Sequence, residues 1–254
     1  MVARAVAQDD ELLDIALARG RAPEEAKNAF TVLTRLASRD PSQEALLKRA
    51  LDQHLADHLT LSLEVGSETG APMPEIIAET VRGKPKANAR QIMMPLLQAI
   101  SKDTTDLQAL AAAIAQINID LLGDKAKKKG GTKIKVQLLS GYEEAAKRFQ
   151  AVGDWARAVD ARRHALEQIR SLHKTGNDRD LVRVSAAQLN LATALSRVGK
   201  FEQALKQGEE AERGFRQLAR RQPDAHRADW ATSLSNLANL LGDLGRSRSW
   251  PILD

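Results

Sequence analysis

The chain has 254 residues, 43% of them hydrophobic and 3% aromatic, with no cysteine and a formal net charge of +5. This length suits one or two domains, and the lack of cysteine excludes disulfide bonds and thiol chemistry. The longest uncharged apolar run, Leu107–Ile119, has 13 residues, fewer than the ~20 that span a bilayer, and residues 1–8 lack the apolar core of a signal peptide, so we expect a cytoplasmic protein without a membrane partner.

The first 123 residues are predicted to form a helical region interrupted by two loops. Capping residues and the spacing of apolar residues favour helices over residues 9–18, 22–38, 42–63, 76–81, 91–101 and 105–122. Glycine and proline place loops at 64–74 and 82–90, and Pro95 should kink the helix that contains it. The last of these helices is apolar nearly all round, which indicates that it is buried.

Basic charge is concentrated in the short segment 124–137. This segment has a net charge of +5, whereas residues 1–123 have −4 and residues 138–254 have +4. Its glycines and lysines predict a flexible, solvated linker between two helical regions. The high isoelectric point is therefore largely a property of this linker.

The stretch from Leu138 onwards repeats with a period of 46 residues. Gly153, Gly199 and Gly245 are separated by this interval, and an alanine stands seven residues before each of them. A large apolar residue stands four residues before each glycine: Phe149, Leu195 and Leu241. A fixed period in this range is typical of stacked helical repeats.

Each copy is predicted to be a helical hairpin. In the middle copy, apolar residues keep helical spacing from Leu181 to Val198, Gly199 ends that helix, and a second helix begins at Phe201. Two helices joined by so short a turn lie antiparallel, with the alanines at their closest approach. We divide the region into repeats 138–183 and 184–229 and a truncated copy, 230–254.

The pattern of these hairpins resembles the tetratricopeptide repeat. The segments "SRVGKFEQALKQGEEA" (196–211) and "NLANLLGDLGR" (236–246) are similar to that family, and the longer period is similar to the variety found in kinesin light chains. The resemblance implies an all-α protein, with the N-terminal helical region followed by a short right-handed α-solenoid. The third copy departs from the family after Gly245, where Trp250 and Pro251 replace the expected residues.

In that family, the first helix of each hairpin lines a concave groove that holds a peptide or a partner's helix. The resemblance places the groove residues at Glu143, Lys147, Gln150, Leu189, Asn190, Thr193, Arg197, Ser235, Asn236, Asn239 and Asp243. The amides of Asn190 and Asn236 could hydrogen-bond a peptide backbone or could equally satisfy neighbouring turns. Glu143 and Lys147 replace the lysine and asparagine with which some members clamp a terminal carboxylate, so that clamp is not expected.

The function that these features imply is binding of a protein or peptide, as an adaptor or as the sensor arm of a bacterial signalling protein. We expect no catalysis and no cofactor. Two alternatives stay open: the N-terminal region could be an effector or enzyme that the repeats regulate, or the linker lysines could contact nucleic acid. Because no aromatic residue lies among these lysines, bases would have no stacking platform.

Other candidate sites are weaker. His54 and His58 lie four residues apart and could share a metal ion, but no third ligand is evident, which favours a solvated helix face. The segment 130–133 lacks the spacing of a phosphate-binding loop. The adjacent pairs Glu143–Glu144 and Glu209–Glu210 diverge on a helix and suit acid–base catalysis poorly.

The truncated copy is predicted to leave an apolar strip uncovered. Its first helix, expected over residues 230–244, presents Leu234, Leu237, Leu241 and Leu244. The eight residues after Arg246 include Pro251, so they cannot supply the second helix that would cover this strip. We therefore expect self-association through the strip or a continuation of the repeat array.

Overall fold

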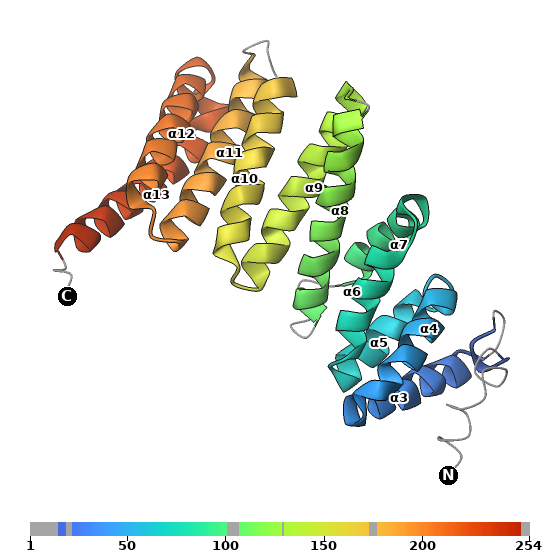
Figure 1. Cartoon of the computed structure of the whole chain (residues 1–254). Helices are drawn as coiled ribbons and strands as arrows, with labels where there is room; N and C mark the ends of the chain where they lie inside the picture. Colours follow the sequence, from blue (N-terminus) through green and yellow to red (C-terminus); the bar gives the residue numbers. More distant parts are fainter. Residues whose placement is uncertain (1–14, 19–21, 101–106, 129, 173–176, 250–254) are drawn as a thin grey trace. The chain divides into compact units, whose positions relative to one another are not determined.

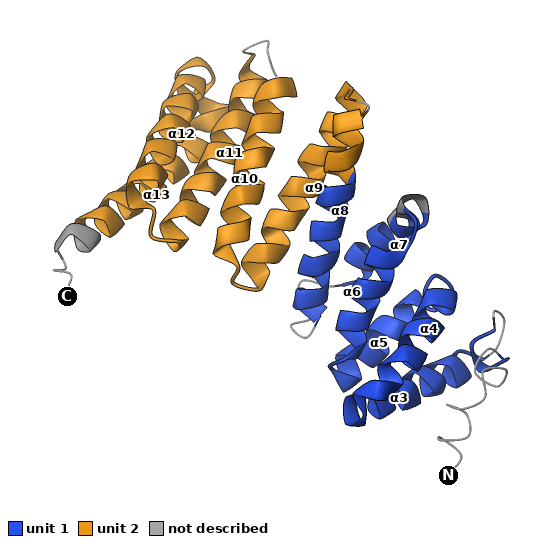
Figure 2. Ribbon diagram, viewed as in Figure 1, with its two compact units in different colours: residues 1–121 blue, residues 122–254 orange. Residues whose placement is uncertain are grey.

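The structure is a computed structural model that describes residues 15–18, 22–100, 107–128, 130–172 and 177–249. These residues form helices and connecting turns and no strand. The chain divides into two compact units, residues 1–121 and 122–254 (Figure 2). The all-α class expected from the sequence is confirmed for the described residues.

Unit 1 is built from short helices that pack on their neighbours (Figure 1). They are α3 (Pro23–Arg39), the single turn η1 (Pro41–Gln43), α4 (Glu44–His54), α5 (Leu59–Thr69), α6 (Met73–Gly83), α7 (Lys86–Ala99) and α8 (Gln108–Lys128), within which the unit boundary falls. Helix α3 packs on α4 and α5, and α6 packs on α4, α5 and α7. The core between them contains the fully buried side chains of Phe30, Leu47, Leu51, Met73 and Ile77.

Three expectations for unit 1 need correction. The helix expected over 42–63 is two helices, because α4 ends at His54 and α5 begins at Leu59. The loops expected at 64–74 and 82–90 are shorter than predicted, because α5 continues to Thr69 and α7 already begins at Lys86. Gly66 lies inside α5, where it packs on Met73 and Leu107; glycine is tolerated in a helix where a neighbour lies close. Of the helix expected over 9–18, residues 9–14 lie outside the described part of the chain.

Unit 2 consists of consecutive antiparallel helix pairs. After the end of α8 come α9 (Thr132–Ala151), α10 (Trp155–Leu172), α11 (Asp178–Arg197), α12 (Phe201–Arg221) and α13 (Pro223–Ser249). Helix α9 pairs with α10 and α11 with α12, and each helix from α10 to α12 also packs on the next one along the chain. The succession visible in Figure 1 is that of a helical repeat. The repeat boundaries drawn at residues 184 and 230 fall inside α11 and α13.

The turns of the two complete hairpins share the glycine conformation and a backbone hydrogen bond. Gly153 and Gly199 both have φ of +74°, in the left-handed region where glycine carries no steric penalty. The amide of Asp154 donates to the carbonyl of Phe149 at 2.8 Å, and the amide of Lys200 donates to Leu195 at 3.0 Å. The same bond recurring 46 residues apart confirms the repeat at the level of the backbone.

The third copy differs from the other two. Gly245, the third glycine of the series, lies inside α13, which runs without a turn from Pro223 to Ser249. The expected helix over 230–244 is therefore longer at both ends. Pro223 suits the first turn of a helix, where its missing N–H leaves no hydrogen bond unmade.

Small residues let the helices of unit 2 approach closely. Ala192 and Ala204 are fully buried and belong to one core cluster with Val159, Leu166, Leu191 and Leu195. A Cβ on Gly214 of α12 would lie 2.0 Å from Ser185 Oγ of α11. The α11–α12 interface therefore depends on residues without bulk.

The segment 124–137, expected to be a flexible linker, is helical over most of its length. Helix α8 continues to Lys128 and α9 begins at Thr132. Lysine is a good helix former, and Lys125, Lys127 and Lys128 in the last turn of α8 favour its negative end. The charge run therefore extends a helix instead of breaking it.

Candidate functional site

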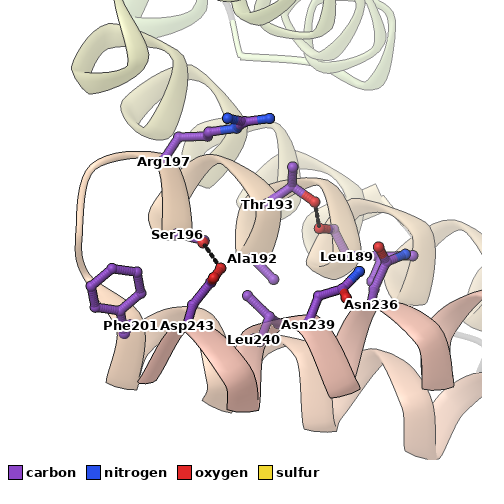
Figure 3. Close-up of a pocket in the computed structure, with 10 residues that line it drawn as sticks. All are labelled: Leu189, Ala192, Thr193, Ser196, Arg197, Phe201, Asn236, Asn239, Leu240 and Asp243. Atoms are coloured by element: carbon purple, nitrogen blue, oxygen red, sulfur yellow. Dashed lines mark hydrogen bonds between the residues drawn. The ribbon is translucent and has the colours of Figure 1, made fainter. Parts of the chain in front are cut away.

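A groove of about 590 Å³ lies between α11, the first helix of its hairpin, and α13, the equivalent helix of the third copy. Its lining residues come from α11, the start of α12 and α13: Leu189, Ala192, Thr193, Ser196, Arg197, Phe201, Asn236, Asn239, Leu240 and Asp243. Figure 3 shows these side chains on the facing sides of the helices. Its floor is partly apolar and its walls carry hydroxyl, amide and charged groups.

Several polar side chains of this groove are held in place. Ser196 Oγ donates a hydrogen bond to Asp243 Oδ2 at 2.9 Å, which joins α11 to α13. Thr193 Oγ1 donates to the Leu189 carbonyl at 3.1 Å (Figure 3). The guanidinium of Arg197 lies over the Trp155 ring, 5.5 Å from its centre. These contacts fix the positions of one cation and one carboxylate beside the groove.

The amides of this surface have no partner. Across the described part of the chain, the side chains of Asn190, Asn236 and Asn239 make no hydrogen bond. Asn190 and Asn239 are exposed and Asn236 is half-buried. Each amide therefore retains two donors and an acceptor for an external group.

A second groove, of about 480 Å³, lies one repeat earlier, between α9 and α11 with α10 beneath. Its lining residues are Thr132, Val136, Leu139, Ser140, Glu143, Arg162, Ala165, Ile169, Leu172, Arg183, Ala186, Ala187 and Asn190. It has more apolar surface than the α11–α13 groove and carries two arginines and one carboxylate. The two grooves are therefore consecutive and chemically different.

Arg162 is a partly buried cation of the α9–α11 groove. Its Nη2 donates to Gln150 Oε1 over 3.4 Å, while its Nε is buried without a hydrogen-bond partner. Burial lowers the pKa of the guanidinium below its usual value, and the nearby carboxylate of Glu143 opposes that shift. Arginine still stays charged, so the groove contains a poorly solvated cation.

The structure divides the sequence-predicted groove residues into three sets. The α11–α13 groove contains Leu189, Thr193, Arg197, Asn236, Asn239 and Asp243. The α9–α11 groove contains Glu143 and Asn190. Lys147, Gln150 and Ser235 line neither groove, and Gln150 instead accepts the hydrogen bond from Arg162.

Sequence reasoning missed Arg162 and Arg183. Arg183 lies near the start of α11, N-terminal to the predicted groove residues of that helix, and Arg162 lies on the second helix of its hairpin. The period itself carried a signal, because Arg162 stands 46 residues before Gly208. Arginine in one copy and glycine in the other differ in both size and charge, so this position distinguishes the two copies.

The other candidate sites gain no support. His54 ends α4 and His58 precedes α5, so the two do not share one helix. His58 Nε2 lies 2.8 Å from the carbonyl oxygen of Leu17, so that nitrogen is a donor here. No group of three or more metal-binding side chains occurs among the described residues.

The linker lysines lie on helices. Lys125, Lys127 and Lys128 are exposed on α8, and Lys133 and Lys135 are exposed on α9; Lys129 lies outside the described residues. Of the helices within the described ranges, none combines the length and apolarity needed to cross a bilayer.

Comparison with known proteins does not assign a family. A scan against protein-family models found no match, and a search of curated proteins found no similar chain. The candidate site therefore rests on the geometry of the two grooves.

Proposed function

We propose that residues 122–254 form a tetratricopeptide-like scaffold that binds a peptide or a partner's helix along α9, α11 and α13. The observation that carries this proposal is the pair of consecutive grooves, with unpartnered asparagine amides at equivalent positions of α11 and α13. The resemblance of the hairpins to that family supports it. The protein would act as an adaptor, or as the sensor arm of a bacterial signalling protein.

The chemistry of the grooves suits a peptide main chain. An amide side chain both donates and accepts, so it can pair with the alternating N–H and C=O groups of an extended segment. Asn190 and Asn236 present such amides at equivalent positions, one repeat apart. Leu189 and Leu240 supply apolar surface for ligand side chains. Affinity would then come from the main chain and selectivity from the pockets.

The proposal is tested with the full chain and a displayed library of random peptides. We expect selected peptides to bind about tenfold or more weakly to the double variant Asn190→Ala/Asn236→Ala, because each lost bond would leave a peptide group unpaired. The melting temperature should stay near that of the wild type, since alanine is a good helix former. Binding is measured by fluorescence anisotropy.

Matched controls come from the same surface. Lys147→Ala and Ser235→Ala change residues that the sequence placed in the groove but that line neither pocket, so they should leave affinity unchanged. A double variant that loses stability without a specific loss of binding would show that the amides serve the fold. A wild-type chain that selects no peptide would overturn the proposal.

A further inference from the structure

One pair of equivalent positions carries very different residues in the two copies. Arg162 of α10 and Gly208 of α12 are 46 residues apart. A Cβ on Gly208 would lie 2.7 Å from Cδ1 of Leu240, so α13 fills this position with its own leucine. The residue 46 before Leu240 is Ala194. The later copy thus has Gly208 and Leu240 at the positions where the earlier copy has Arg162 and Ala194.

The surroundings of Arg162 leave it without a full counterion. Its hydrogen bond to Gln150 is long, at 3.4 Å, and its buried Nε has no partner. Glu143 is the one carboxylate that lines the same groove, and its side chain is exposed. A partly buried guanidinium with an unpaired N–H is costly unless an acceptor satisfies it, so an acceptor supplied by a ligand would reduce that cost.

The other residues that line the groove indicate which kind of ligand would supply this acceptor. Arg183 brings a second guanidinium to the lining of the groove, beside the carboxylate of Glu143. Val136, Leu139 and Ile169 provide apolar surface beside the two cations. Among the described residues, no aromatic ring lines the groove, so these residues offer the bases of a nucleic acid nothing to stack on. An aliphatic side chain next to an anionic one matches this surface.

We propose that the α9–α11 groove is a specificity pocket for one acidic side chain of the bound peptide, aspartate or glutamate, with an aliphatic neighbour. Arg162 and Arg183 bind the carboxylate, and Val136, Leu139 and Ile169 contact the neighbour. Glu143 repels a second acid, so the pocket selects a single acidic residue and not a polyacidic run. This inference rests on the proposed peptide-binding function and assigns a sequence preference to it.

The test uses the full chain and a library of short peptides with amidated C-termini. One position at a time is fixed as glutamate or as glutamine. We expect wild-type protein to enrich glutamate beside leucine, isoleucine or valine at a single position. The variant Arg162→Gln should lose this enrichment, and Arg163→Gln should keep it. Arg163 is a matched control, since it pairs with Asp160 at 3.2 Å and lines neither groove.

A double-mutant cycle then assigns the contact. The selected peptide should bind about tenfold more weakly after its glutamate is changed to glutamine, because a hydrogen bond to a charged group is lost. In Arg162→Gln that same peptide change should have almost no effect. Arg183→Gln, which removes the other cation, should weaken the glutamate preference partly. Thermal unfolding confirms that each variant is folded.

The outcomes separate the two proposals. Selection of peptides without an acidic preference, or with one that survives in Arg162→Gln, would overturn the specificity pocket and leave the scaffold function standing. The glutamine peptide is also tested with a free C-terminal carboxylate. If it then binds as tightly as the glutamate peptide, the pocket recognises a chain end and not an acidic side chain, which would overturn the proposal. A wild-type chain that selects no peptide would overturn both.

Discussion

Asp154 caps the N-terminus of α10, whereas the equivalent residue of the next repeat does not cap α12. It precedes α10, and its Oδ1 accepts the backbone N–H of Arg157 at 3.0 Å while its Oδ2 accepts from Arg157 Nε at 2.5 Å. These bonds, the backbone one foremost, lower the pKa of the Asp154 carboxyl below its usual value of 3.8. The equivalent residue before α12 is Lys200, whose side chain makes no capping bond.

Replacing Asp154 with alanine should lower the free energy of unfolding by about 1 kcal/mol at neutral pH, because two bonds at the helix N-terminus are lost. The folded-state pKa is depressed, so this contribution is present above pH 3.8 and disappears as the pH falls through the folded pKa. The wild type and the variant should therefore converge in acid. Urea unfolding followed by tryptophan fluorescence reports on the right unit, since Trp155, Trp230 and Trp250 all lie in residues 122–254.

The opposite change at the equivalent position should stabilise the protein. Lys200→Asp introduces a capping carboxylate before α12, and we expect a gain of up to about 1 kcal/mol. The same urea titration measures it. If Lys200→Asp destabilises the protein, the two turns share a backbone conformation, but the surroundings of residue 200 do not accommodate a capping carboxylate.

At the scale of elements, the α11–α12 interface depends on Gly214. A Cβ there would lie 2.0 Å from Ser185 Oγ and 3.2 Å from Ser185 Cβ, and Ser185 is fully buried. The hydroxyl of Ser185 has no hydrogen-bond partner. Gly242 of α13, by contrast, has nothing within 4 Å of such a Cβ.

Gly214→Ala should therefore destabilise the protein by roughly 1–3 kcal/mol through overpacking, whereas Gly242→Ala should stabilise it by up to about 1 kcal/mol through helix propensity. The double variant Ser185→Ala/Gly214→Ala should recover much of the loss, because it removes the clashing hydroxyl, which has no bond to lose. Thermal unfolding of the variants checks this. Equal effects of the two glycine changes would contradict the close packing of α11 and α12.

The sequence predicted those elements whose signals are local. Gly153 and Gly199 marked turns correctly, since a left-handed residue after an apolar stripe is a strong stop signal. Gly245 follows the same pattern of apolar residues and yet lies in a helix, and no later helix packs back against α13 among the described residues. The lysines of 124–137 looked like a linker by charge, although lysine favours helices.

The site was predictable only where it follows the first helix of each repeat. Six of the predicted residues line the α11–α13 groove together, because equivalent helix positions repeat every 46 residues. Arg162 was not found, since its place depends on how far apart α9 and α11 stand over α10. That separation is a tertiary property without a local signal.

At the scale of the whole molecule, α13 exposes an apolar face. The equivalent face of α11 is buried. Leu234 and Leu241 are 42% and 51% exposed. The residues 46 before them, Gln188 and Leu195, are buried, because α11 packs on both α10 and α12. Of the predicted strip, Leu237 is half-buried and Leu244 is buried.

We predict that this face mediates self-association. The wild type should sediment as a mixture whose average mass rises with concentration, and Leu234→Gln/Leu241→Gln should reduce that rise, because apolar burial drives association. Met94→Gln is a control, since Met94 is 46% exposed on α7 and lies in the other unit. A wild type that stays monomeric and binds no hydrophobic dye would show that the face is covered.

The inequality of Arg162 and Gly208 also bears on how many ways a ligand can lie on the repeats. Identical repeats offer a ligand several alignments, each shifted by one unit. Here a peptide displaced by one repeat would bring its acid against Leu240, which packs at Gly208 and lines the α11–α13 groove. In the proposed mode of binding, the unequal pair therefore favours one alignment of the peptide over the alignment shifted by one repeat.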